Sequence, residues 1–170
     1  MIKILNQIFR TGIVTEPLNR LPDAAIVKET VGRLDEAMKK RLRQSLTIRQ
    51  VDAGSCNGCE LEIHAINNSI YNCERFGIHF TASPRFADML LVTGPVATNM
   101  EIALIRTYNA TPTPKLVVAL GDCGCNGGIF AESYASLGGI DKVIPVDVYI
   151  PGCPPTPEAI LNGILQAIGG

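Results

Sequence analysis

Four of the six cysteines in this sequence stand in short loops rich in glycine or proline, and thiols so placed can bind metals or do redox chemistry. Cys56 and Cys59 are three residues apart in AGSCNGC, Cys123 follows Gly-Asp in GDCGCNGG, and Cys153 lies in PGCPPTP. A C-x-x-C pair alone is typical of a disulfide, a redox dithiol, a zinc site or part of an iron–sulfur site. Which of these uses applies depends on how the fold positions the three loops.

Strand and helix patterns alternate along the chain after residue 45. This alternation predicts an α/β domain over 46–170 with a flavodoxin-like parallel sheet flanked by helices. The residues before it, 1–45, are expected to be an N-terminal extension, an arm and a helix that contact partner subunits. Strands are predicted over 46–52, 78–83, 88–94, 115–122 and within 143–152, and helices over 28–45, from the end of the first cysteine loop to about Asn68, over 99–109 and over 157–168.

The predicted order of elements brings the three cysteine loops together. Cys56 and Cys59 follow the first strand, Cys123 ends the strand over 115–122, and Cys153 follows the last strand. In open parallel sheets, sites form at the carboxyl ends of the strands. We therefore expect the four thiols to converge on one edge of the sheet.

Four converging thiolates can hold either an iron–sulfur cluster or a zinc ion. The glycines and prolines of the loops permit close approach to a bulky group and favour a cluster. A structural zinc site usually has two tight cysteine pairs, and only one pair here is tight. A redox dithiol needs neither Cys123 nor Cys153. From the residues alone the cluster is favoured, and zinc and a dithiol stay open.

Composition indicates a subunit that other proteins cover. Of 170 residues, 46% are apolar and only 18% are charged, and the mean hydropathy is +0.21. A net charge of −1 gives no reason to expect a nucleic-acid partner. The opening MIKILNQIFRTG lacks a secretory pattern and no apolar run is long enough to span a membrane, so we expect a reducing compartment without structural disulfides.

Three motifs together resemble the small subunits of [NiFe] hydrogenases and the related B-type subunits of respiratory complex I: CNGCE, GDCGCNGG and IPGCPPTPEAI. The resemblance extends over about 46–168. It implies a flavodoxin-like domain with one [4Fe–4S] cluster held by Cys56, Cys59, Cys123 and Cys153. Matched to the same motifs, Cys125 is an extra thiol rather than a ligand, and a buried core position is expected for Cys73.

Two features of the chain resemble those of small subunits from the energy-converting, membrane-bound [NiFe] hydrogenases. The first motif is C-x-x-C, whereas complex I subunits have adjacent cysteines, and the chain ends soon after the helix that follows Cys153. The resemblance implies an electron-transfer subunit of an oxidoreductase, with the active site on a hydrogenase-like large subunit. It further implies a ferredoxin-like iron–sulfur subunit, integral membrane subunits and a peripheral place on the cytoplasmic side of the inner membrane.

Two other functions stay open at this stage. One is the equivalent cluster subunit of a nickel-free, complex I-like dehydrogenase that reduces a quinone or a sulfur compound. The other is a free-standing zinc or iron–sulfur module, which the apolar composition disfavours.

Charged residues outside the cysteine loops receive weaker assignments. Glu62 and Arg85 resemble residues of complex I subunits and are expected to serve a proton path, an interface or the surroundings of the cluster. Glu60 is expected to favour the start of its helix. The two histidines, His64 and His79, are expected to be structural, and the KKRLR run is expected to be a solvated helix face.

Overall fold

The computed structural model describes residues 45–169 together with Ala25, Glu29, Gly32 and Arg33. Its centre is a five-stranded sheet in the order β2-β1-β3-β4-β5. All four neighbouring pairs are parallel, as the sequence predicts, and the order is that of a doubly wound flavodoxin-like sheet. The strands are β1 (Leu46–Asp52), β2 (Ile78–Phe80), β3 (Met89–Thr93), β4 (Leu116–Leu120) and β5 (Val148–Ile150).

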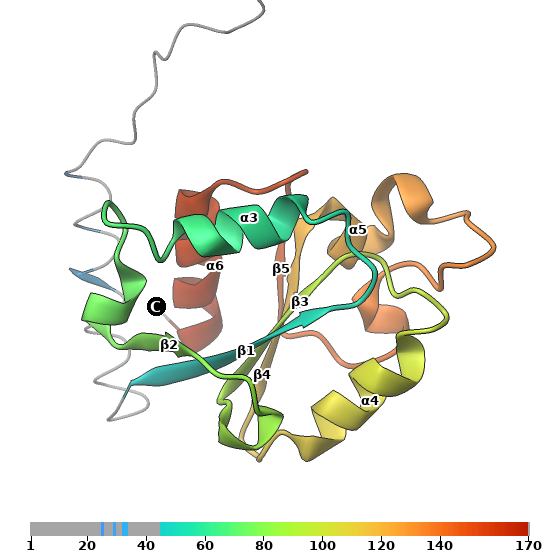
Figure 1. The fold of residues 1–170 in the computed structure, drawn as a ribbon, viewed down its shortest axis with the longest axis horizontal. Helices are drawn as coiled ribbons and strands as arrows, with labels where there is room; N and C mark the ends of the chain where they lie inside the picture. The colour runs from blue at the N-terminus through green and yellow to red at the C-terminus, as the bar shows by residue number, and fades with distance from the viewer. Residues whose placement is uncertain (1–24, 26–28, 30–31, 34–44, 170) are drawn as a thin grey trace, which may run out of the picture.

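Helices cover both faces of the sheet (Figure 1). Helices α3 and α6 pack on one face, where Ile63 and Ile164 join a core with Ile48 and Leu91. Helix α4 packs on the other face, where Leu104 joins a second core with Val92. The α-helices are α3 (Gly58–Ala65), α4 (Glu101–Ala110), α5 (Gly121–Asn126) and α6 (Pro157–Ile168); the 3₁₀ turns are η1 (Cys73–Phe76), η2 (Pro84–Phe86), η3 (Gly128–Phe130) and η4 (Ile140–Lys142).

The central strands are apolar on both sides because both of their faces are covered. Every residue of β3 is buried, and successive side chains alternate between the two cores. Thr156 caps α6 by accepting a hydrogen bond from the Ala159 amide at 3.3 Å, and Pro157 begins the helix, as the sequence predicts.

The structure corrects several predicted element bounds. The strand predicted over 78–83 ends at Phe80, because the chain turns into η2 at Pro84. The last strand is confined to Val148–Ile150, and the first helix ends at Ala65 rather than near Asn68. The strand predicted over 115–122 ends at Leu120, because Gly121–Asn126 form helix α5, which Gly127 ends with a left-handed conformation at φ +91°.

Most of the N-terminal extension predicted over 1–45 lies outside the described residues, so its arm and its role stay predictions. Within the helix predicted over 28–45, Glu29, Gly32 and Arg33 are helical. In the described part of the chain, no helix has the length and apolar character needed to cross a membrane.

Candidate metal centre

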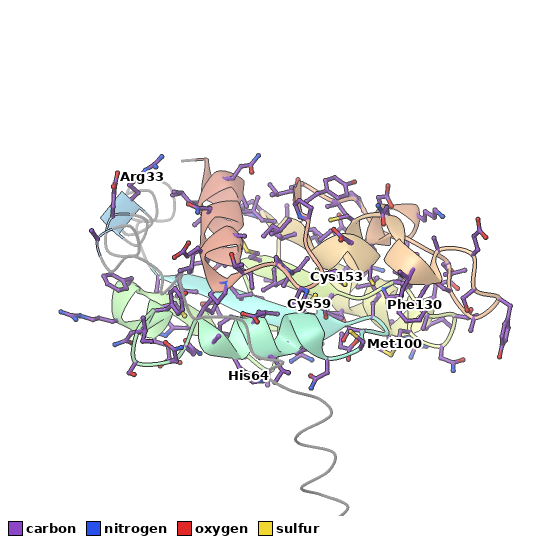
Figure 2. All side chains as sticks on the ribbon, turned by 90° about the horizontal axis from the view of Figure 1, so that it is seen from above. Arg33, Cys59, His64, Met100, Phe130 and Cys153 are labelled. Carbon is purple, nitrogen blue, oxygen red and sulfur yellow. The ribbon has the colours of Figure 1, made fainter. Side chains whose placement is uncertain are left out.

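The four cysteines assigned from sequence line one cavity of about 180 Å³ at the carboxyl edge of the sheet. The loop after β1 supplies Cys56 and helix α3 supplies Cys59, while α5 and the loop after β5 supply Cys123 and Cys153. Figure 2 shows Cys59 and Cys153 side by side at this edge. The convergence predicted from strand order is therefore present. The other lining residues are Ser55, Gly58, Gly94, Asp122, Gly152 and Pro154.

Burial divides the four thiols into two pairs. Cys59 and Cys123 are half-buried, whereas Cys56 and Cys153 are exposed. Burial, followed by the charges of Glu60 and of the other three cysteines, raises the pKa of Cys59 from 9.0 to about 12. Burial and then Cys153 raise the pKa of Cys123. Because thiolates so close together repel one another, a cation or a cationic cluster would be needed to hold all four ionised.

Glycines allow the backbone to pass close to the sulfur atoms. Gly121 has φ +82°, and a Cβ atom there would lie 2.6 Å from Cys59 Sγ. A Cβ atom at Gly128 would lie 2.9 Å from Cys123 Sγ. Any other residue at these positions would displace a thiol, so the site requires glycine for space as well as for backbone conformation.

Two aspartates hold the cysteine loops in register. Asp52 Oδ1 accepts hydrogen bonds from the amides of Gly54 at 2.8 Å and Ser55 at 2.7 Å, which shapes the turn before Cys56. Asp122 and Gly152 are joined reciprocally: the Gly152 amide donates to Asp122 Oδ1 at 2.7 Å, and the Asp122 amide donates to the Gly152 carbonyl at 2.9 Å. This pair ties the residue before Cys123 to the residue before Cys153.

A buried carboxylate lies beside the site. Glu60 is 6% exposed, and its Oε1 accepts a hydrogen bond from the hydroxyl of Thr93, which is fully buried at the end of β3. Glu60 Oε2 is buried with no hydrogen-bond partner among the described residues. The sequence predicts only a helix-start role for Glu60, and no motif singles out Thr93. The available signal was the helical spacing of Glu60, Ile63 and Ile66, which places Glu60 on the buried face.

The donor set and the size of the cavity fit an iron–sulfur cluster. Within the described part of the chain, no group of three or more His, Cys, Asp or Glu side chains is arranged to hold a metal ion. A zinc ion needs its ligands within about 2.0–2.3 Å of one point. The four thiols instead border a cavity more than ten times the ~10–15 Å³ that holds one water. Four separated cysteines match the Cys₄ ligation of a [4Fe–4S] cluster.

Other residues assigned from sequence do not line the cavity. Glu62 is half-buried on α3, and Arg85 lies in η2, which precedes the amino end of β3. His64 and His79 are exposed, and His64 lies farther along α3 than Cys59 (Figure 2). The roles predicted for Glu62 and Arg85 stay predictions.

The two remaining cysteines lie apart from the cavity lining. Cys125 is half-buried with its Sγ 3.8 Å from the Ala119 carbonyl. Cys73 is fully buried, as predicted, and its Sγ donates to Asn67 Oδ1 at 2.7 Å. Both positions agree with non-ligand roles.

A family model described as NADH ubiquinone oxidoreductase, 20 Kd subunit, matches residues 56–167. The match begins at the first cysteine of the cavity and ends within α6. It therefore includes all four thiols together with α3, α5 and β5, whereas β1 precedes it.

Similar proteins belong to hydrogenase and respiratory complexes. Formate hydrogenlyase subunit 7 of Escherichia coli is 44% identical over 151 residues, 89% of this chain and 59% of that protein, so the chain matches well under two thirds of this relative. The probable membrane-bound hydrogenase subunit mbhJ of Pyrococcus furiosus is 48% identical over 130 residues, 76% of this chain and 77% of that protein. A chain in the structure of an archaeal membrane-bound sulfane sulfur reductase is 40% identical, with a TM-score of 0.65 over 79% of this chain and 72% of that one.

Proposed function

The chain belongs to the family of the NADH ubiquinone oxidoreductase, 20 Kd subunit, and on this premise we propose that it is the electron-transfer small subunit of a membrane-associated [NiFe] hydrogenase complex. Its cofactor is one [4Fe–4S] cluster bound by Cys56, Cys59, Cys123 and Cys153. The observation that supports this most directly is the single cavity lined by these four thiols.

A bound [4Fe–4S] cluster supplies one-electron transfer, and the protein supplies placement and electrostatic surroundings. Four thiolates from three loops fix the position of the cluster against the sheet edge. Gly121 and Gly128 let the backbone approach the ligand sulfurs. The reciprocal hydrogen bonds between Asp122 and Gly152 hold the loops of Cys123 and Cys153 at a constant separation.

The exposed thiols indicate where a partner contacts this chain. Cys56 and Cys153 lie at the surface, whereas Cys59 and Cys123 lie on the protein side of the cavity. A cluster held here would face solvent unless another subunit covered it. The proposed cover is the hydrogenase-like large subunit, whose nickel site would exchange electrons with the cluster.

The hydrogenase assignment rests on similarity to hydrogenase subunits and on the C-x-x-C motif. Formate hydrogenlyase subunit 7 and the probable membrane-bound hydrogenase subunit are both more than 40% identical to this chain. In the proposed complex a ferredoxin-like iron–sulfur subunit delivers electrons. Integral membrane subunits anchor the assembly on the cytoplasmic side of the inner membrane.

A second candidate function is supported by the similarity to the sulfane sulfur reductase chain. In that case the chain would be the equivalent cluster subunit of a nickel-free, complex I-like oxidoreductase that reduces a sulfur compound or a quinone. The ligand cysteines would be the same in both candidate functions, so this chain alone does not discriminate between them. The metal content of the large partner subunit does discriminate between them.

The two candidates differ in nickel. We would tag this chain, purify the intact complex with mild detergent, and measure iron, nickel and zinc beside H₂ evolution from a reduced low-potential dye. Nickel together with H₂ evolution is the expected result. Iron without nickel or H₂ evolution would favour the second candidate, and one zinc per chain without iron would overturn both.

A further inference from the structure

A second cavity, of about 430 Å³, lies at the sheet edge beside β1. We call it the β1 groove. Its lining comes from β1 and from the residues that end and follow β2: Arg49, Gln50, Asp52, Phe80, Thr81 and Ala82. It shares no lining residue with the cavity of the four cysteines.

The groove exists because β2 is shorter than β1. Strand β2 pairs with β1 only over Leu46–Ile48, whereas β3 pairs with β1 from Ile48 to Asp52. Beyond Ile48, whose carbonyl accepts from the Thr81 amide at 2.9 Å, the chain of β2 leaves the sheet. Among the described residues, the carboxyl half of β1 therefore has a neighbouring strand on one side only.

The open side presents backbone hydrogen-bonding groups. Ile48 bonds toward β2, and bonding direction alternates along a strand, so Gln50 and Asp52 turn their N–H and C=O groups toward the groove. Ala53 bonds the opposite way, to the Thr93 carbonyl, in agreement with this alternation. Within the described residues, the Gln50 backbone makes no hydrogen bond to Thr81 or Ala82. Such an edge is a template for another strand.

The groove also contains a buried hydrogen-bond donor without an acceptor. Arg49 Nε is buried and has no hydrogen-bond partner among the described residues. The carboxylate of Asp52 also lines the groove, and its Oδ1 accepts hydrogen bonds from the amides of Gly54 and Ser55. A buried N–H group without an acceptor is costly, and a carboxylate is the best-matched partner of a guanidinium.

We propose that the β1 groove binds an extended segment of a partner subunit, which adds as a strand beside Gln50 and Asp52 and places a carboxylate against Arg49. Main-chain hydrogen bonds to an open edge provide affinity, and side-chain pairing provides specificity. The unpaired Nε of Arg49 favours a segment that carries a carboxylate. This inference goes beyond the cluster and rests on the proposed function only in requiring partner subunits.

The test is photo-crosslinking in the intact complex. Gln50 is replaced by the photo-crosslinking amino acid p-benzoylphenylalanine, and the crosslinked peptide is identified by mass spectrometry. The matched control places the same amino acid at Gln166, an exposed glutamine on α6. The expected product at position 50 is a segment of a partner subunit that contains Asp or Glu, and this product is absent at position 166.

The role of Arg49 is tested in the same intact complex, with p-benzoylphenylalanine at position 50. Arg49→Ala should lower the crosslink yield at position 50 about tenfold, because a charge-assisted hydrogen bond is lost. Arg106→Ala, at an exposed arginine of α4, should leave the yield unchanged. Equal yields in the two variants would overturn the proposal, as would a crosslink only to residues 1–44 of this chain, a partner segment without acidic residues, or no crosslink.

Iron and the EPR signal of the cluster are measured on every preparation. They report whether each variant is folded and loaded. A loaded complex without the expected crosslink overturns the strand-addition proposal and leaves the proposed function intact. A crosslinked complex without a cluster would support strand addition and overturn the proposed function.

Discussion

At the scale of single residues, the hydrogen bond from Thr93 to Glu60 is the contact that the cysteine motifs do not reveal. The bond joins the end of β3 to the first turn of α3, directly beside Cys59. Glu60 Oε2 already lacks a partner. Loss of the Thr93 hydroxyl would leave the whole carboxylate of Glu60 without a donor in a buried position.

We therefore expect Thr93→Val, which keeps the shape of the side chain, to lower the free energy of unfolding by about 1–3 kcal/mol. The matched control is Thr98→Val, because the Thr98 hydroxyl also donates a hydrogen bond, to the Ala135 carbonyl at 3.1 Å, but is exposed. Urea denaturation of the full chain measures both. Equal losses in the two variants would show that the buried carboxylate does not depend on Thr93.

Cys73 provides a pH prediction away from the cluster. Burial, and then the charge of Glu74, raise the pKa of this thiol from 9.0 to about 11. Below about pH 9 the thiol is protonated in both the folded and the unfolded chain. Between about pH 9 and 11 only the unfolded chain loses the proton, so the free energy of unfolding should fall as the pH rises.

The Cys73→Ala variant lacks this group and should show a smaller decline over the same range. Denaturation series at several values between pH 8 and pH 11 compare the two slopes, which separates the titration from the constant cost of the substitution. Parallel pH dependences would mean that the folded environment does not hold the proton on Cys73.

At the scale of elements, the close approach of α5 to α3 makes Gly121 essential to the site. Its φ of +82° disfavours other residues, and a Cβ atom would lie 2.6 Å from Cys59 Sγ. We expect Gly121→Ala to reduce both the iron content and the free energy of unfolding, the latter by roughly 1–3 kcal/mol.

Gly58 is the matched control for Gly121, because it is a glycine that lines the cavity beside the cysteines. It needs no positive φ, and a Cβ atom there would meet nothing nearer than 3.6 Å. Gly58→Ala in the first turn of α3 should keep its iron. Iron analysis and urea denaturation compare the two variants. Equal loss of iron from Gly121→Ala and Gly58→Ala would contradict this prediction.

Strand order made the cysteine edge predictable, whereas side-chain contacts were not predictable. Cys56, Cys123 and Cys153 each follow a strand, and the carboxyl-end rule alone places them together. The helical spacing of Glu60, Ile63 and Ile66 indicates the buried face of α3, but it does not identify Thr93 as the partner of Glu60. The early end of β2 depends on where Pro84 turns the chain, so the β1 groove was also invisible in the sequence.

At the scale of the whole molecule, the apolar composition agrees with a subunit that partners cover. Large apolar side chains that do not line the cysteine cavity are exposed: Ile129 is 87% exposed and Phe86 75%. Exposed apolar groups of this kind are typical of protein contacts. The chain should therefore purify with its partners in mild detergent, and gel filtration of the tagged complex compares its mass with the 18.2 kDa of the chain alone.

The central claim is that Cys123 binds the cluster and that Cys125, two residues away, does not. Cys123 lines the cavity, whereas Cys125 has its Sγ near the Ala119 carbonyl. The most direct measurement is iron content and the EPR spectrum of the reduced intact complex for Cys123→Ala and Cys125→Ala. We predict that Cys123→Ala loses the [4Fe–4S] signal of this subunit and that Cys125→Ala keeps it. Loss in Cys125→Ala with retention in Cys123→Ala would contradict the assignment.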